Sequence, residues 1–198
     1  MPQVEFSGSI TVVENIDDAR AAVAELSGCG IVGFDTETRP SFKKGCVNRP
    51  ALLQLSTHDR AYLFRINRIG LPDFVLSFLS DSSIVKVGLS IKDDFSSLRR
   101  CCNVEPAGFV ELQEVAGRFG IEERGLQRMY ALLFGMKISK SQQLSNWEND
   151  KLTDGQCQYA AIDAWACLVL YEYMEKLRRS GDYQIVRKDA EDSNTEEG

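Results

Sequence analysis

Residues 31–37 read Ile-Val-Gly-Phe-Asp-Thr-Glu, a short apolar run that ends in two acids. A run of this length between turn signals is typical of a buried strand. The next apolar runs, 51–56 and 61–64, predict an antiparallel hairpin around a polar turn at His58. Upstream, residues 9–13 predict a first strand, and the amphipathic pattern over 16–26 predicts a helix that is closed by glycines.

After residue 70 the pattern alternates between helix and strand. We expect a helix over 71–79, a strand over 84–87, a helix over 91–102 and a short strand near Phe109. Two or three short helices should lie between residues 117 and 147. Thr153 and Gln156 fit a capping box at the start of a long helix over 153–179, and residues 183–186 predict a last strand. Strands that alternate with helices predict an α/β fold, with a mixed sheet flanked by helices in a single domain.

Composition excludes a wholly disordered chain and bounds the partners. The chain has 198 residues, 43% of them hydrophobic and 26% charged, with a formal net charge of −6. This balance argues against a nucleic-acid partner at first sight. However, five acids and no bases lie in residues 189–198, so the rest of the chain carries 24 acids against 23 bases. We therefore expect a nearly neutral domain over residues 1–187 and a disordered acidic tail over 188–198.

The sequence also predicts where the protein resides. Neither a secretion signal nor an apolar stretch long enough to span a membrane is present, so we expect a cytoplasmic protein with no membrane partner. The six cysteines form no Cys-x-x-Cys pair and are expected to be reduced. His58 is the single histidine and lies in a polar turn, which leaves little room for catalysis by a Ser-His-Asp or Cys-His arrangement.

Asp35 and Glu37 form the first candidate site. Residues two apart on a strand point to the same face, so these two side chains should project together from the sheet edge. Two close carboxylates repel each other unless a cation or a proton lies between them, and oxygen ligands suit Mg²⁺ or Mn²⁺. The alternative is a strand end with solvated acids.

The long helix provides the second candidate. Asp163 falls in the middle of its apolar stripe, and Tyr159 lies one turn earlier on the same face. A carboxylate buried there without a partner is costly, so it should bind a cation or be held by an arginine or by backbone amides.

The third candidate is Asp94, in the first turn of the helix over 91–102. Helical phase places Asp94 beside the inward face, whereas Asp93 should point to solvent. Read alone, Asp94 is also explained as a first-turn acid favoured by the helix dipole. Together, the three segments offer carboxylates that two divalent ions could hold for phosphodiester hydrolysis.

Three motifs resemble those of the DEDDy 3'-5' exonucleases, the family that includes ribonuclease D and the Werner-type exonuclease domain. They are Phe34-Asp35-Thr36-Glu37, Val87-Gly88 followed by Ile91 and Asp94, and Tyr159-Ala160-Ala161-Ile162-Asp163. They occur in the family's order and cover nearly all of the predicted domain. Further similarity lies in residues 51–56 and in Lys140-Ser141 to Ser145-Asn146-Trp147.

The resemblance implies a ribonuclease H-like fold and a metal-dependent exonuclease. Asp35, Glu37 and Asp163 would bind one ion, Asp35 would bridge to a second, and Asp94 would hold the second ion largely through water. Tyr159 would orient or deprotonate the attacking water. The expected cofactors are two Mg²⁺ or Mn²⁺ ions and no organic cofactor, and the products are nucleoside 5'-monophosphates released from a single-stranded or frayed 3' end.

A basic loop could contact the substrate backbone. Between Thr38 and Thr57 there is no acid, and the loop leaves the strand that carries Asp35 and Glu37. Its charges would lie beside the scissile phosphate, although a solvated loop explains them equally well. Lys140 is a further candidate by resemblance, and Trp147 is expected in the core. The candidate nucleic-acid-binding residues are Arg39, Lys43, Lys44, Arg49 and Lys140.

Two other functions compete with the exonuclease. The same fold could form an inactive module that binds nucleic acid or protein, although the presence of all four carboxylates and Tyr159 argues against lost catalysis. A phosphatase of the haloacid dehalogenase type is the third, because Asp35-Thr36-Glu37 superficially resembles an Asp-x-Asp nucleophile motif. Glu37 in place of the second Asp fits that class poorly.

Overall fold

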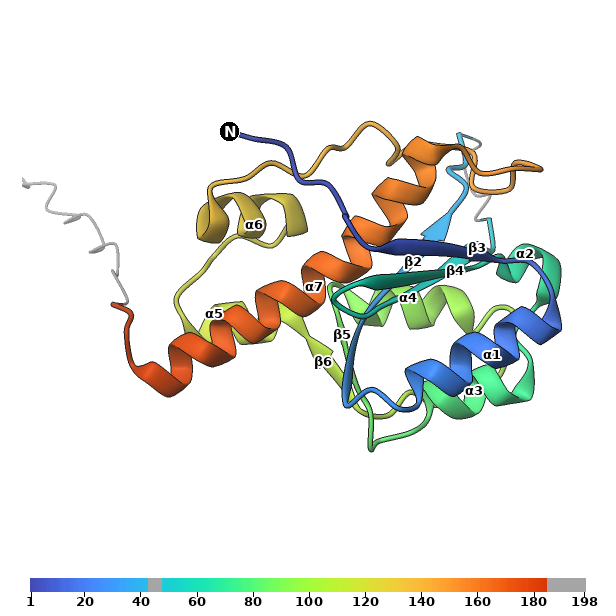
Figure 1. Ribbon diagram of the computed structural model, residues 1–198, viewed down its shortest axis with the longest axis horizontal. Coiled ribbons are helices and arrows are strands. Elements are labelled where there is room, and N and C mark those ends of the chain that lie inside the picture. The colour runs from blue at the N-terminus through green and yellow to red at the C-terminus, as the bar shows by residue number, and fades with distance from the viewer. Residues whose placement is uncertain (43–47, 185–198) are drawn as a thin grey trace, which may run out of the picture.

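One mixed sheet of six strands forms the centre of the computed structural model, which describes residues 1–42 and 48–184 (Figure 1). The strands are β1 (Ser9–Val13), β2 (Ile31–Thr38), β3 (Pro50–Ser56), β4 (Arg60–Phe64), β5 (Val85–Gly88) and β6 (Phe109–Glu111). Their order across the sheet is β1-β4-β3-β2-β5-β6. The antiparallel pairs are β2 with β3 and β3 with β4, whereas β1–β4, β2–β5 and β5–β6 are parallel. The predicted α/β fold and the hairpin are confirmed.

Seven helices complete the part of the chain that the structure describes. They are α1 (Ile16–Leu26), α2 (Ile66–Ile69), α3 (Asp73–Leu79), α4 (Ile91–Leu98), α5 (Leu112–Arg118), α6 (Leu126–Phe134) and α7 (Asp154–Ser180). The capping box at Thr153 and Gln156 is present, with both backbone amides bonded reciprocally to the side chains. That reciprocal pair explains why the longest helix begins at Asp154.

Three hydrophobic clusters cover the two faces of the sheet. One packs α1, α3 and α4 against strand residues such as Val32 and Phe34. Another packs α5, α6 and α7 against strand residues such as Val87, and the third packs Trp147 and Tyr159 against strands β3 and β4. In Figure 1, α7 crosses the sheet with α5 and α6 beside it, while α1 and α3 lie together on the other side. Each helix therefore buries its apolar stripe against one sheet face.

Four predictions differ from the structure. Between residues 117 and 147, a range that the structure describes throughout, two or three short helices are expected, but α6 alone lies wholly within it, because α5 begins at Leu112. Helix α3 begins at Asp73 rather than Leu71, because Pro72 is its N-cap residue. Helix α4 ends at Leu98, and the four residues to Cys102 form turns. Tyr183 and Gln184 belong to no strand, and the rest of the segment 183–186 lies outside the described residues. The expected acidic tail, 188–198, lies outside them as well. Within the described ranges, none of the helices is long and apolar enough to cross a membrane.

Candidate active site

Strand β2 places Asp35 and Glu37 on the sheet face that α7 covers. Gly33 lies two residues before Asp35 on the same face, and a Cβ atom added there would meet the Ala164 carbonyl oxygen at 1.9 Å. Only glycine lets the helix approach the strand so closely. The close contact brings one turn of α7 directly over the end of β2, beside the two carboxylates.

Helix α7 contributes Asp163 and Tyr159. Asp163 is 4% exposed and Tyr159 is 7% exposed. One ligand oxygen each from Asp35, Glu37 and Asp163 lies within 4.8 Å of the others. The Oδ1 atom of Asp163 is buried and has no hydrogen-bond partner among the residues that the structure describes. The sequence left open that an arginine or backbone amides hold this carboxylate. No described arginine or backbone amide bonds its Oδ1 atom.

Asp94 reaches the site from the opposite face of β2. Its carboxylate accepts a 2.5 Å hydrogen bond from the hydroxyl of Thr36, the residue between the two acids of the strand. Asp94 is not part of the three-carboxylate cluster. The neighbouring Asp93 is exposed, as helical phase predicts.

Burial raises the pKa of all four carboxylates, and repulsion from neighbouring acids adds to the shift for Asp35, Glu37 and Asp94. Burial, and then the charge of Asp163, raises the pKa of Asp35 well above its ordinary value. Burial together with the Asp35 and Asp163 charges raises the pKa of Glu37 to about 10. Burial raises the pKa of Asp163 to about 7, against a hydrogen bond from Tyr159 that lowers it.

The pKa of Asp94 is raised to about 8, first by burial and then by the charge of Asp35, although the bond from Thr36 opposes the shift. A group of acids whose pKa values all rise lacks the positive charge that would stabilise the ionised forms. A cation among these carboxylates would stabilise their ionised forms.

A cavity of about 410 Å³ opens onto these residues. Asp35, Glu37, Tyr159 and Asp163 line one part of it. Sequence reasoning missed its other walls, because they come from segments without a chemical motif. These residues include Arg124, Gly125, Leu126, Gln127 and Gln143.

Arg124 is the one basic side chain of the described chain that lines this cavity. It precedes α6, whose N-cap residue is Gly125 and whose first turn carries no side-chain cap. The first amides of a helix favour negatively charged groups. The positively charged Arg124 side chain and the N-terminus of α6 thus line the same cavity as the acids. This arrangement is suited to a phosphate group.

The basic residues predicted from the sequence are dispersed. Arg39 lies 3.1 Å from Glu148 in an ion pair. Arg49 lines a different cavity of about 370 Å³, together with Cys101 and Cys102. Lys140 is exposed and lines neither cavity. The remaining two candidates, Lys43 and Lys44, lie outside the described residues.

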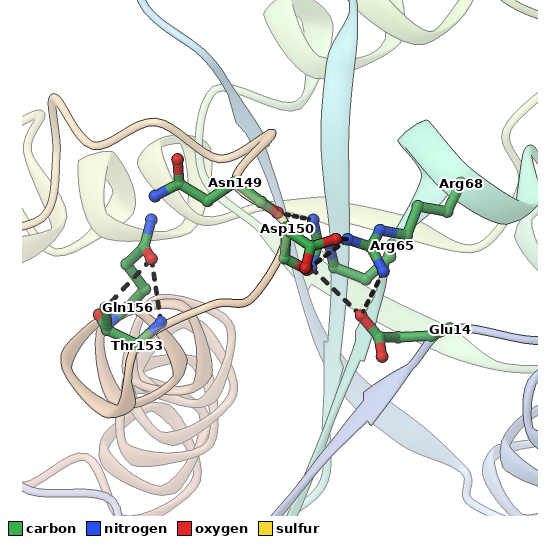
Figure 2. A network of polar contacts seen from close by, with 7 residues as sticks. All are labelled: Glu14, Arg65, Arg68, Asn149, Asp150, Thr153 and Gln156. Atoms are coloured by element: carbon green, nitrogen blue, oxygen red, sulfur yellow. Dashed lines mark hydrogen bonds and ion pairs between the residues drawn. The ribbon is translucent and has the colours of Figure 1, made fainter.

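A polar network fixes the loop that leads into α7 (Figure 2). Arg65 is fully buried and donates to the carbonyl oxygens of Asn149 and Asp150 and to the Glu14 carboxylate. Arg68 bonds the same Glu14 and Asp150.

Within the same loop, Trp147 is fully buried, as expected, and its ring packs 5.9 Å from that of Tyr159. The buried side chain of Gln156 also donates to the Asn146 carbonyl oxygen. The loop is thus tied at both ends beside Tyr159.

Buried Gln54 lies beside the site, and the sequence motifs do not mark it. It lies directly opposite Asp35 in the β2–β3 register. Neither of its side-chain amide atoms has a hydrogen-bond partner within residues 1–42 and 48–184. His58, by contrast, is in the β3–β4 turn, where it lies 2.6 Å from Glu172.

Comparison with known proteins identifies relatives of this chain. A family model described as a 3'-5' exonuclease matches residues 10–178. A bifunctional 3'-5' exonuclease and ATP-dependent helicase of Mus musculus is 34% identical in an alignment 192 positions long that covers 92% of this chain and 14% of the mouse protein. A 3'-5' exonuclease of Arabidopsis thaliana is 33% identical in an alignment 193 positions long that covers 89% of this chain and 67% of the plant protein.

Solved structures share the fold at lower identity. The exonuclease domain of Aedes aegypti Nibbler superposes with a TM-score of 0.81 at 22% identity, over 91% of this chain and 95% of that one. Ribonuclease D of Escherichia coli gives a TM-score of 0.77 at 20% identity, over 87% and 46% of the two chains. Ribonuclease D of Trypanosoma brucei in complex with RNA gives a TM-score of 0.74 at 22% identity, over 85% of this chain and 63% of that one. These likenesses confirm the expected ribonuclease H-like fold.

Proposed function

Because the chain belongs to the 3'-5' exonuclease family, we propose that it hydrolyses phosphodiester bonds at the 3' end of a nucleic acid and releases nucleoside 5'-monophosphates. The observation that carries the proposal is the buried, unpartnered Oδ1 atom of Asp163 beside Asp35 and Glu37. An inactive relative that kept only the fold would have no need for this costly group.

The carboxylates fit divalent ions. Three carboxylates with a shared space and an unsatisfied oxygen offer the hard oxygen ligands that Mg²⁺ and Mn²⁺ prefer. Asp35, Glu37 and Asp163 would hold one ion, and Asp94 would hold a second with Asp35 between them. When bound, two such ions supply activation of the attacking water and stabilisation of the leaving oxygen.

Asp94 is suited to the second ion because it lies outside the three-carboxylate cluster yet close enough for the Asp35 charge to raise its pKa. The Thr36 hydroxyl fixes one of its oxygens and leaves the other available. Strand β2 therefore organises both parts of the proposed metal site, from its two faces.

Tyr159 would orient the attacking water. Its hydroxyl hydrogen-bonds Asp163, and its ring packs against the fully buried Trp147. Both contacts restrict the hydroxyl to the wall of the cavity. A group that holds water at one place contributes to catalysis by orientation even without taking a proton.

The substrate would enter with its backbone toward Arg124 and the N-terminus of α6. Both line the cavity that the carboxylates of β2 and α7 also line. The similarity to a ribonuclease D structure that holds RNA supports a nucleic acid as the ligand class. We assign the phosphate contact to Arg124 in preference to Arg39, whose charge is paired with Glu148.

Incubation with a 5'-labelled oligonucleotide tests the function. With Mg²⁺ or Mn²⁺ the wild-type protein should give a ladder of shortened products, and Asp35→Asn should give none. Asp93→Asn is the matched control, because Asp93 carries the same charge on α4 but is exposed. Binding of the oligonucleotide without a ladder would favour the inactive module instead. An aspartyl-phosphate trapped on Asp35 would indicate the phosphatase, which the family match disfavours.

A further inference from the structure

Glu111 lies at the end of β6 and belongs to none of the three sequence motifs. In the parallel pairing of β5 with β6 it is directly beside Gly88, the last residue of β5. The chain leaves Gly88 through Leu89 and Ser90 and enters α4 at Ile91. Glu111 therefore lies next to the turn that launches the helix of Asp94.

The Glu111 carboxylate binds this turn with both oxygens. Oε1 accepts a 3.0 Å hydrogen bond from the Ser90 amide, and Oε2 accepts a 2.9 Å bond from the Ile91 amide. Oε1 also accepts a 3.2 Å bond from the Gln113 amide at the start of α5. One side chain thus caps two helices that are adjacent in space.

Helix α4 depends on this external cap. Its N-cap residue, Ser90, provides no capping bond from its own side chain. Ser90 has φ 61°, and it is the one non-glycine residue in the described ranges with positive φ. A non-glycine residue stays in this region only where surrounding contacts hold it. The two bonds from Glu111, and a 3.3 Å bond from the Gln113 side chain to the Ser90 hydroxyl, are such contacts.

Asp94 lies one turn beyond the cap. It is held by Thr36 from β2 on one side, and its backbone position is set by where α4 begins. A shift of the Ser90 turn would move the first turn of α4 as a unit, because the helix amides bond along the chain. Glu111 therefore fixes the backbone position of Asp94, and Thr36 fixes its side chain.

We infer that Glu111 is a positioning residue for Asp94: by bonding the Ser90 and Ile91 amides, it places the Asp94 carboxylate where the second divalent ion binds. The inference rests on the proposed function. Glu111 is not a catalytic residue, because it contacts only backbone amides in the structure. Outer contacts of this kind tune metal affinity through the residues that they orient.

Mn²⁺ binding tests the inference without measuring activity. Isothermal titration of the full chain with Mn²⁺ alone should give two ions for the wild-type protein. Glu111→Gln keeps the shape of the side chain but leaves only one acceptor oxygen. We expect it to weaken one of the two ions by about 10-fold or more and to leave the other unchanged.

Two further variants separate positioning from general stability. Glu114→Gln makes the same chemical change on the exposed first turn of α5 and should leave both ions unchanged. Asp94→Asn should weaken the same single ion, and the double variant Glu111→Gln/Asp94→Asn should bind Mn²⁺ as Asp94→Asn alone does. This non-additivity is what a residue acting through Asp94 produces, whereas a merely structural role adds its effect.

The outcomes are distinguishable. Wild-type protein that binds two ions, with Glu111→Gln indistinguishable from it, overturns this inference and leaves the proposed function standing. A double variant with a further loss beyond that of Asp94→Asn also overturns it. Wild-type protein that binds no Mn²⁺ overturns the proposed function, and this inference with it.

Discussion

Thr36 and Asp94 are 58 residues apart in sequence, and the hydroxyl of the first donates a 2.5 Å hydrogen bond to the carboxylate of the second. Thr36 points to the face of β2 opposite Asp35 and Glu37, because successive strand residues alternate. A single strand therefore supplies two carboxylates on one face and, on the other, the anchor of a third. This relationship explains how the end of the central strand β2 gathers acids from both faces of the sheet.

Replacing Thr36 with Val keeps the volume and removes the donor. We expect exonuclease activity at limiting Mn²⁺ to fall by about 10-fold, because an unanchored Asp94 holds the metal less well. The free energy of unfolding should fall by only about 1 kcal/mol, the usual effect of one hydrogen bond. Thr38→Val, on the same strand, is the control. Equal activity of the two variants would show that the Thr36 bond does not matter.

Gly33→Ala should separate α7 from β2. The added methyl group would lie 1.9 Å from the Ala164 carbonyl oxygen, which belongs to helix backbone and cannot rotate away. We expect a loss of at least about 2 kcal/mol in urea unfolding and loss of the ladder, because Asp163 moves with the helix. Gly30→Ala, whose added Cβ meets nothing within 4 Å, should be neutral. A stable, active Gly33→Ala protein would contradict the close approach.

Metal-free protein should lose stability as the pH rises. An acid whose pKa is raised by folding binds its proton more tightly in the folded chain, so the folded state is favoured at low pH. The advantage is lost as the pH rises through the folded pKa values, which are about 7 for Asp163, 8 for Asp94 and 10 for Glu37. The loss begins above the ordinary carboxyl pKa of about 4, so in EDTA the free energy of unfolding should fall from about pH 4 to about pH 10.

Mg²⁺ should flatten this dependence, because bound cations stabilise the ionised carboxylates. Asp163→Asn should flatten it in part without any metal, since one titrating group is gone, whereas Asp93→Asn should not. Urea unfolding at several pH values, with EDTA and with Mg²⁺, measures all of these effects. Stability that rises with pH in EDTA would show that the carboxylates are not the repelling cluster described above.

Arg124→Ala should weaken binding of a single-stranded oligonucleotide and leave the metal site intact. Loss of one phosphate contact reduces the slope of log binding constant against log salt by about 1. Replacing individual phosphates with neutral methylphosphonates should locate the contact, because at one position the variant and the wild type become equal. Arg128→Ala, on the exposed side of α6 and paired with Glu123, is the control. An unchanged salt slope would remove Arg124 from the substrate path.

The sequence predicted the elements that local patterns define. The strand predicted over 31–37 forms as β2 (Ile31–Thr38), and the capped helix forms as α7, because apolar runs and the Thr153 capping box are local signals. These two elements carry Asp35, Glu37, Tyr159 and Asp163, so the candidate residues of the site could be named from sequence alone.

The supporting contacts could not be predicted, because they join residues far apart in the chain. No local pattern shows that Arg39 pairs with Glu148, 109 residues away, or that Glu111 caps the helix of Asp94. The left-handed conformation of Ser90 is likewise imposed by its neighbours, since serine does not favour it. The predicted contact of the basic loop with the substrate rests on its charge and on its nearness in sequence to Asp35 and Glu37. Neither property shows where an ion pair forms.

Crystals soaked with Mn²⁺, with anomalous scattering recorded at the manganese edge, test the central claim most directly. We expect two peaks about 3.5 to 4 Å apart, one contacted by Asp35, Glu37 and Asp163 and the other on the side of Asp94. The absence of any peak among these carboxylates at saturating Mn²⁺ would contradict it.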